Sequence, residues 1–114
     1  MRPDEADRAG FGDIAEYGCR LARHLDGGDL DRFLADECMQ DAVVRCLLVI
    51  GEAARRMSDA TRELHPVLPW AQMIAMRNLL VHDYGTIDMR EVWVTATRDV
   101  PHLVEQAQTA LGSD

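Results

Sequence analysis

The sequence predicts an all-α protein built as an antiparallel helical bundle. Apolar residues recur at every third or fourth position along almost the whole chain, which is the spacing of one face of an α-helix. No stretch has the two-residue alternation of a half-buried strand. The chain has 114 residues. We expect residues 1–114 to form a single domain, because domains usually run to about 100–150 residues.

The first half of the chain should contain three helices, over residues 3–25, 30–34 and 37–57. Gly27 and Gly28 are placed to end the first helix, and Asp29 is placed to cap the second. The third helix carries a long apolar stripe that neighbouring residues widen, so it should lie centrally between two others. The stripe consists of Val43, Leu47, Ile50, Ala54 and Met57, widened by Val44, Leu48 and Gly51.

A short segment and a longer helix should follow. Ser58 is placed to cap the short segment and Pro66 to end it, since proline disfavours helix at the residue before it. Pro69 suits the first turn of the next helix, where its missing N–H is no loss. We expect that helix to run to residue 83 or 84, with Gly85 as its stop.

The last helix should begin near Asp88, because Asp88 and Glu91 have the spacing of a capping box. Pro101 falls inside this helix and should kink it, since its ring clashes with the preceding turn. The inward stripe of the helix is expected to comprise Val92, Ala96, Val100, Leu103, Ala107 and Leu111.

The charge balance restricts how the protein could meet a nucleic acid. All 12 basic residues are arginines, and 20 acidic residues bring the net charge to −8. Such a chain is not expected to bind nucleic acid nonspecifically through its whole surface. Any RNA site must therefore be a local basic pocket in an acidic body.

Neither a metal nor another cofactor is expected. The three cysteines and four histidines lack the spacing of a zinc site. Residues 1–7 are polar and acidic, which is unlike a signal peptide, and the apolar run over residues 46–51 is far too short to cross a bilayer. We therefore expect a cytoplasmic protein with no membrane partner.

The segment PWAQMIAMRNLLVHDYGTID is the most informative part of the chain. On an ideal helix one face of it would carry Trp70, Met73, Arg77, Leu80 and Tyr84. Arg77 thus takes a place in an otherwise apolar stripe. Because an unpaired buried charge is costly, Arg77 needs either a carboxylate partner or a solvent-lined cleft that meets an anion.

His82 lies about 140° round an ideal helix from Arg77. The two side chains would not meet unless the helix loosens near its end or the cleft is shared with a second chain. Asn78 is one turn before His82 and could hydrogen-bond its ring, which would fix the tautomer. Periodicity alone leaves open whether His82 is functional or only a partner of the helix dipole.

The order Arg77-Asn78-x-x-x-His82-x-Tyr84 resembles the Arg-x(4–6)-His motif of the HEPN superfamily, in the extended form seen in HepT-like toxins. The likeness covers most of the chain. Three further segments carry it: Gly51-Glu52-Ala53-Ala54 with its following arginine, Pro69-Trp70, and Ile87-Asp88 leading to Val92-Trp93.

The resemblance implies a HEPN-like homodimer in which two copies of the motif meet in a cleft between the chains. It also implies a metal-independent endoribonuclease, in which the ribose 2′-hydroxyl attacks the adjacent phosphate. His82 would be the general acid or base, a role that suits histidine because its reference pKa is about 6.5. Arg77 would hold the phosphate and stabilise the transition state, and Asn78 would orient His82 or the scissile phosphate. Few basic residues accompany Arg77: Arg55 and Arg56 are candidates, and the alternative for both is a solvated helix end. So small a footprint favours a structured RNA such as tRNA.

The partner that the resemblance implies is a minimal nucleotidyltransferase antitoxin. In this family the antitoxin neutralises the toxin by attaching AMP to the motif tyrosine, which is Tyr84 here. A bulky anion two residues from His82 would block the cleft and repel RNA.

The sequence also favours a dimer, because the third helix has a surplus of apolar surface and Arg77 and His82 lie at an angle that one chain does not close.

Two other functions are compatible with the same sequence. The first is a non-catalytic HEPN partner, or substrate-binding subunit, of a nucleotidyltransferase. The second is a helical regulatory or dimerisation module with no connection to nucleotides. In the second case Arg77 would form a salt bridge inside the bundle.

Overall fold

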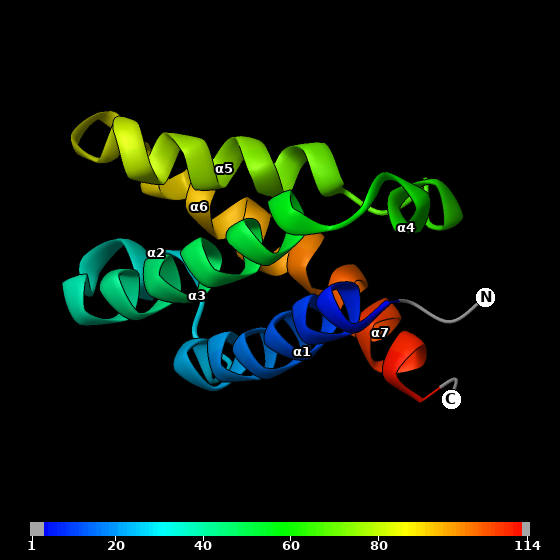
Figure 1. The fold of residues 1–114 in the computed structure, drawn as a ribbon. Helices are drawn as coiled ribbons and strands as arrows, with labels where there is room; N and C mark the ends of the chain where they lie inside the picture. The colour runs from blue at the N-terminus through cyan, green and yellow to red at the C-terminus, as the bar shows by residue number, and fades with distance from the viewer. Residues whose placement is uncertain (1–3, 113–114) are drawn as a thin grey trace.

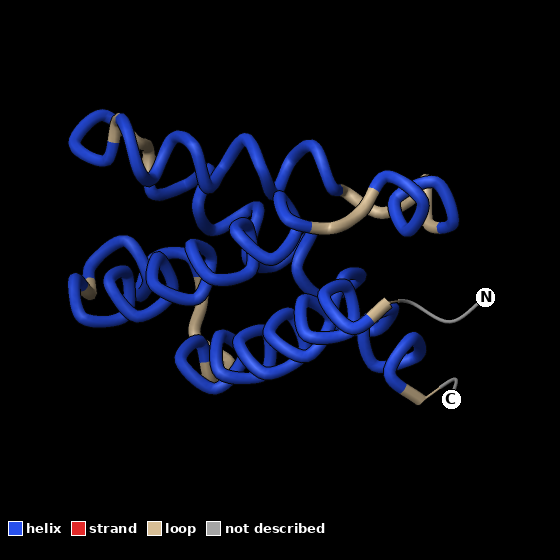
Figure 2. Tube along the Cα trace, in the orientation of Figure 1, coloured by secondary structure: helices blue, strands red, loops and turns tan. Residues whose placement is uncertain are grey.

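The computed structural model describes residues 4–112, apart from the side chain of Tyr84. Its α-helices are α1 (Glu5–Leu25), α2 (Leu30–Ala35), α3 (Glu37–Arg56), α4 (Asp59–Leu64), α5 (Trp70–His82), α6 (Met89–Val94) and α7 (Val100–Leu111). Residues 4–112 contain no strand (Figure 2), which confirms the predicted all-α class. The predicted start of the first helix at Pro3 lies outside the described residues, and a single domain over residues 1–114 stays a prediction.

Helix α3 is the centre of the bundle, as predicted. It packs between α1 and α5 and runs antiparallel to both (Figure 1). Helix α7 also packs against α1. The guanidinium of Arg8 on α1 donates to the carbonyl of Leu111, the last residue of α7, at 3.0 Å. All five residues of the predicted stripe on α3 are buried, so this helix supplies much of the core.

Side-chain caps begin the short helices where the sequence predicted them. The carboxylate of Asp29 accepts from the N–H of Arg32, and the hydroxyl of Ser58 accepts from the N–H of Thr61. Asp88 begins α6 in the same way. At the end of α1 the chain turns through a left-handed Gly27, with φ of 70°, so the predicted stop is confirmed.

The predicted boundaries of α5 are wrong at both ends by a residue or two. Pro69 precedes the first turn of the helix instead of lying in it, and the helix ends at His82. Beyond it the carbonyl of Asp83 accepts from both the N–H and the hydroxyl of Thr86, each at 2.9 Å. These two bonds turn the chain into a 3-10 turn, Tyr84–Thr86, before Gly85 can act as a stop.

A π turn interrupts the last helix just before Pro101, and the predicted kink itself stays a prediction. This turn covers Thr95–Asp99 and joins α6 to α7, so the single predicted helix is three segments. The N–H of Val100 donates to the carbonyl of Thr95, five residues back. Proline has no N–H to donate and its ring crowds the turn before it, so a wider turn there relieves the clash.

The apolar surplus of α3 lies inside the core and not on the surface, so α3 does not offer the dimer surface that we expected from it. The reason is that α1 and α5 cover its two sides. Among the described residues the exposed large apolar side chains are Leu64, Val67, Leu79, Val81 and Val94. Leu79 and Val81 belong to α5. No helix within residues 4–112 is both long enough and apolar enough to pass through a membrane.

Asp7 connects α1 to the segment that follows α3. Its side chain is buried, with 3% of its surface exposed. One carboxylate oxygen accepts from the N–H of Ser58 at 2.9 Å, and the other accepts from the hydroxyls of Ser58 and Thr61 at 2.5 and 2.6 Å. Burial by itself would raise the pKa of Asp7, but these hydrogen bonds outweigh it and the net pKa lies below the usual value. The ionised carboxylate therefore stabilises the folded chain.

Asp7→Asn should lower the free energy of unfolding by about 1–3 kcal/mol at neutral pH, because an amide accepts fewer and weaker hydrogen bonds than a carboxylate. The folded pKa is depressed, so the stabilisation is present above the unfolded pKa and is lost as pH falls through the folded value. Urea unfolding between pH 7 and pH 3 measures this. The difference in free energy of unfolding between wild type and Asp7→Asn should close in acid. The control Asp13→Asn, at an exposed position of the same helix, should have the same free energy of unfolding as wild type.

Candidate functional site

Arg77 lies where α5 crosses α3 at close range, and Gly51 permits the crossing. Gly51 is buried, and a Cβ atom added to it would lie 2.4 Å from Cβ of Arg77 and 3.0 Å from the carbonyl oxygen of Met73. Any larger residue would force the two helices apart. The stem of Arg77 thus rests against the backbone of α3, and 24% of its side-chain surface remains exposed.

The carboxylate of Glu52 holds three arginines together. Arg55 binds it through two nitrogens, at 2.6 and 3.0 Å. Nε of Arg56 lies 3.4 Å from Oε2, and Nε of Arg77 lies 3.7 Å from Oε1. We call Glu52, Arg55, Arg56 and Arg77 the arginine cluster. It concentrates positive charge at one place in an acidic chain, and it places Arg55 and Arg56 beside Arg77.

Glu52 remains ionised throughout the physiological range. Its hydrogen bonds with Arg55 are the main cause, and the positive charges of Arg55, Arg77 and Arg56 act in the same direction. Partial burial opposes them, but the pKa of Glu52 still falls to about 2. A carboxylate with so low a pKa is a weak base, so its contribution to the site is its charge and its position.

Asn78 pairs with Arg77. Its side-chain oxygen accepts from Nη1 of Arg77 at 2.9 Å. The sequence had suggested His82 as the partner of Asn78 instead. Nε of Arg77 thus faces Glu52 and Nη1 faces Asn78, while neither interaction involves Nη2.

His82 lies on a different side of α5 from Arg77. It is exposed at the last position of α5, and the N–H of the following residue still donates to the carbonyl of Leu79 at 2.8 Å. The helix is therefore regular through His82, which leaves the two side chains about 140° apart around its axis. Of the two ways in which they could meet, loosening of the helix is excluded and a second chain remains. The Tyr84 side chain, the predicted AMP acceptor, lies outside what the structure describes.

Glu52 is the residue whose role sequence reasoning missed. It belongs to the Gly51-Glu52-Ala53-Ala54 segment, but its link to Arg77 spans 25 positions and depends on how α3 and α5 cross. A partial signal was present, because Arg55 and Arg56 follow Glu52 at the three- and four-residue spacings of helical ion pairs.

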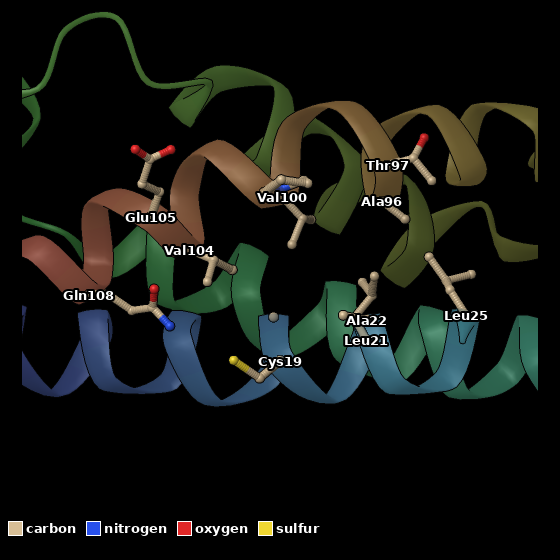
Figure 3. Close-up of a pocket in the computed structure, with 12 residues that line it drawn as sticks. Cys19, Leu21, Ala22, Leu25, Ala96, Thr97, Val100, Val104, Glu105 and Gln108 are labelled. Atoms are coloured by element: carbon tan, nitrogen blue, oxygen red, sulfur yellow. The ribbon is translucent and has the colours of Figure 1, made fainter. Parts of the chain in front are cut away.

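A separate groove lies away from the arginine cluster. It has a volume of about 490 Å³ and runs between α1 and α7. Figure 3 shows its mainly apolar lining, with Leu21 and Leu25 on one wall and Val100 and Val104 on the other. A smaller groove of about 350 Å³ between α1 and α3 includes Glu52 and Arg56 and so borders the arginine cluster. Within residues 4–112, no three His, Cys, Asp or Glu side chains are grouped to hold a metal ion.

These features define a small helical-bundle protein in which the arginine cluster joins α3 to α5 and His82 is exposed at the end of α5. The model of the family described as ribonuclease HepT-like matches residues 14–110. The chain belongs to this HepT-like family of the HEPN superfamily.

Individual relatives agree with this assignment. A protein of Thermococcus cleftensis, provisionally named ribonuclease HepT, is 42% identical over 71 residues, which are 62% of this chain and 64% of that protein, just under two thirds of its length. Two proteins of Methanocaldococcus jannaschii, provisionally named RNases, are 33% and 35% identical over 82% and 84% of this chain, and the matches cover 78% and 88% of their own lengths. No solved structure was found that matches the chain.

Gly51→Ala should lower the free energy of unfolding by about 1–3 kcal/mol, because the added methyl group collides with Cβ of Arg77 and with backbone. Gly12→Ala is the matched control, since a Cβ at that helical position meets nothing within 4 Å. The control should be neutral or should stabilise by up to about 1 kcal/mol. Urea unfolding compares the two. Equal stability of Gly51→Ala and wild type would mean that the crossing does not depend on glycine.

Proposed function

We propose that this protein is a metal-independent endoribonuclease and the toxin of a toxin–antitoxin pair. The observation that carries the proposal is the pair Arg77 and His82 on α5, in a chain of the HepT-like ribonuclease family. Arg77 is held in the arginine cluster and His82 is exposed. Arginine presents a planar fork of donors that matches phosphate, and histidine can exchange a proton near neutral pH. Cleavage of RNA without a metal needs a group that transfers protons and a cation that stabilises the charge on the phosphoryl oxygens, and these two residues can supply both.

In the proposed reaction the ribose 2′-hydroxyl attacks the adjacent phosphorus. The 2′-oxygen loses its proton as it bonds to phosphorus, and the bond from phosphorus to the 5′-oxygen breaks. That oxygen takes up a proton as it leaves, and the other product is a 2′,3′-cyclic phosphate. His82 acts as the general acid or base, and Arg77 stabilises the extra negative charge on the phosphoryl oxygens. Asn78 supports Arg77 by accepting from Nη1, which restricts how the guanidinium turns.

The charge distribution favours a folded RNA as substrate. The net charge of −8 repels a polyanion at a distance, so binding must depend on the arginine cluster and its immediate surroundings. A small cationic footprint engages few phosphates, and affinity then depends on the shape of the RNA. We propose tRNA, or another structured RNA, as the substrate class.

We propose that the active form is a homodimer whose site combines groups from both chains. Arg77 faces α3 and His82 faces solvent, so one chain does not bring them together. Helix α5 also exposes Leu79 and Val81, by 38% and 48%, although a helix that is apolar on several sides is normally covered. In this proposal a second copy packs against the exposed sides of α5, which would cover apolar residues there and would bring His82 of one chain toward Arg77 of the other.

The antitoxin in this proposal is a minimal nucleotidyltransferase that transfers AMP to Tyr84. The backbone of Tyr84 begins the 3-10 turn that follows α5, two residues after His82. An AMP group there would add bulk and negative charge next to the general acid or base. Both effects would oppose binding of RNA.

Expression of the wild-type protein should arrest growth and yield a discrete fragment in total host RNA. Arg77→Ala and His82→Ala should each abolish both effects, with cleavage by the purified proteins reduced by about 10²–10⁴-fold.

Co-expression of the two variants should restore part of the cleavage, because a mixed dimer keeps one site with both groups intact. Val81→Glu in both chains should prevent this restoration, whereas Val67→Glu, an equal change on the loop before α5, should not. A folded wild type that leaves RNA uncut would favour the non-catalytic partner instead.

Co-expression with a minimal nucleotidyltransferase from the same genome should add the mass of AMP to the protein. Peptide mass spectrometry should locate the adduct on Tyr84, and Tyr84→Phe should prevent it while leaving the ribonuclease activity in place. The Tyr17→Phe variant, on α1, should still be modified. An adduct on another residue would remove Tyr84 as the acceptor without touching the ribonuclease assignment.

A further inference from the structure

We propose that Glu52 is the positioning residue for Arg77, holding the guanidinium so that its Nη2 end faces the scissile phosphate. This inference rests on the proposed ribonuclease function and assigns a role to a residue outside the Arg-x(4–6)-His motif. The geometry that points to it is the ion pair between Oε1 of Glu52 and Nε of Arg77, at 3.7 Å across the crossing of α3 and α5.

Glu52 is itself a fixed point. Arg55 binds both of its carboxylate oxygens, at 2.6 and 3.0 Å, and Arg56 adds a contact at 3.4 Å. Bidentate pairs of this kind restrict both side chains, which removes much of the freedom that a surface glutamate normally has. The carboxylate therefore offers Arg77 a partner at a defined place.

Two restraints orient the guanidinium of Arg77. Glu52 attracts Nε, and the side-chain oxygen of Asn78 accepts from Nη1 at 2.9 Å. The planar group cannot turn about its axis without loosening one of these contacts. Its Nη2 end is involved in neither, so it can donate to a phosphoryl oxygen while the other contacts stay in place.

The charges make the position of Arg77 depend on Glu52. Three guanidinium groups surround one carboxylate, and the cluster retains a surplus of positive charge that attracts phosphate. Without the carboxylate the three arginines would repel one another. Arg77 is the half-buried member, so it would move outward along α5 and lose its alignment.

The substitution Glu52→Gln separates alignment from attraction. The amide keeps the shape of the side chain but removes a negative charge from the site, so RNA should bind as tightly as before or several-fold more tightly. Cleavage at saturating protein should fall about 10- to 100-fold, because a misplaced guanidinium no longer meets the charge of the transition state. Binding and rate should therefore move in opposite directions, which loss of folding would not cause.

The experiment compares wild type, Glu52→Gln and Glu16→Gln. Glu16 pairs with Arg20 at 2.6 Å on the exposed face of α1, so Glu16→Gln removes the same charge and an ion pair away from the cluster. Total host RNA is the probe for single-turnover cleavage between pH 5 and pH 8. Binding of the same RNA is measured in a His82→Ala background at low and high salt, and thermal unfolding checks that each variant folds.

A slower Glu52→Gln with undiminished binding, an unchanged pH profile and a normal Glu16→Gln supports the proposal. Wild-type rates in Glu52→Gln would overturn it, and so would parallel loss of binding, cleavage and stability. A shifted pH profile would also overturn it, because Glu52 would then transfer a proton instead of positioning Arg77. Wild type that binds RNA without cutting it refutes the ribonuclease function, and this proposal fails with it. Cleavage by wild type thus distinguishes failure of the ribonuclease proposal from failure of the Glu52 proposal alone.

Discussion

The close crossing of α3 and α5 at Gly51 is the constraint on which the rest of the site depends. With no side chain at this position, the backbone of α5 can rest on α3, and the stem of Arg77 takes the space that a Cβ would fill. The next residue on α3 is Glu52, so the same crossing sets the distance between the carboxylate and Arg77. Arg55 and Arg56 follow one turn later and complete the cluster.

Polar contacts hold the segment beyond the arginine cluster in place. Asp7, from the start of α1, accepts from Ser58 and Thr61 just after the end of α3. The guanidinium of Arg62 donates to the last carbonyls of α3, those of Ala54 and Arg55, at 3.3 and 2.8 Å. The end of the helix that carries Arg55 and Arg56 is thus held from two directions, which restricts its motion relative to α1.

An acidic protein can meet RNA when its positive charge is concentrated. The net charge of −8 is spread over the chain, whereas three of its twelve arginines share a single carboxylate. At physiological ionic strength the Debye length is about 8 Å, so a phosphate close to the cluster interacts mainly with it and less with distant acidic residues. In the proposed ribonuclease this arrangement would give contact only where the RNA fits.

Local patterns in the sequence determined most of the secondary structure. The 3.6-residue spacing placed the helices and the central position of α3, and single residues set their ends, such as Asp29, Ser58 and Gly27. The π turn before Pro101 and the early end of α5 at His82 depended on competing local hydrogen bonds that a pattern of residue types does not rank.

The motif around Arg77 and His82 was also visible in the sequence, because spacing along one helix is a local property. The tertiary structure alone decided which groups meet Arg77. Its contact with Glu52 joins two helices that are far apart in the chain, and its geometry depends on a crossing that only packing sets. Packing likewise left two large apolar side chains exposed on α5, Leu79 and Val81, and none on α3, since α3 is covered from both sides. Sequence periodicity determines which face of a helix is apolar, but only the assembled bundle decides which of those faces remains uncovered.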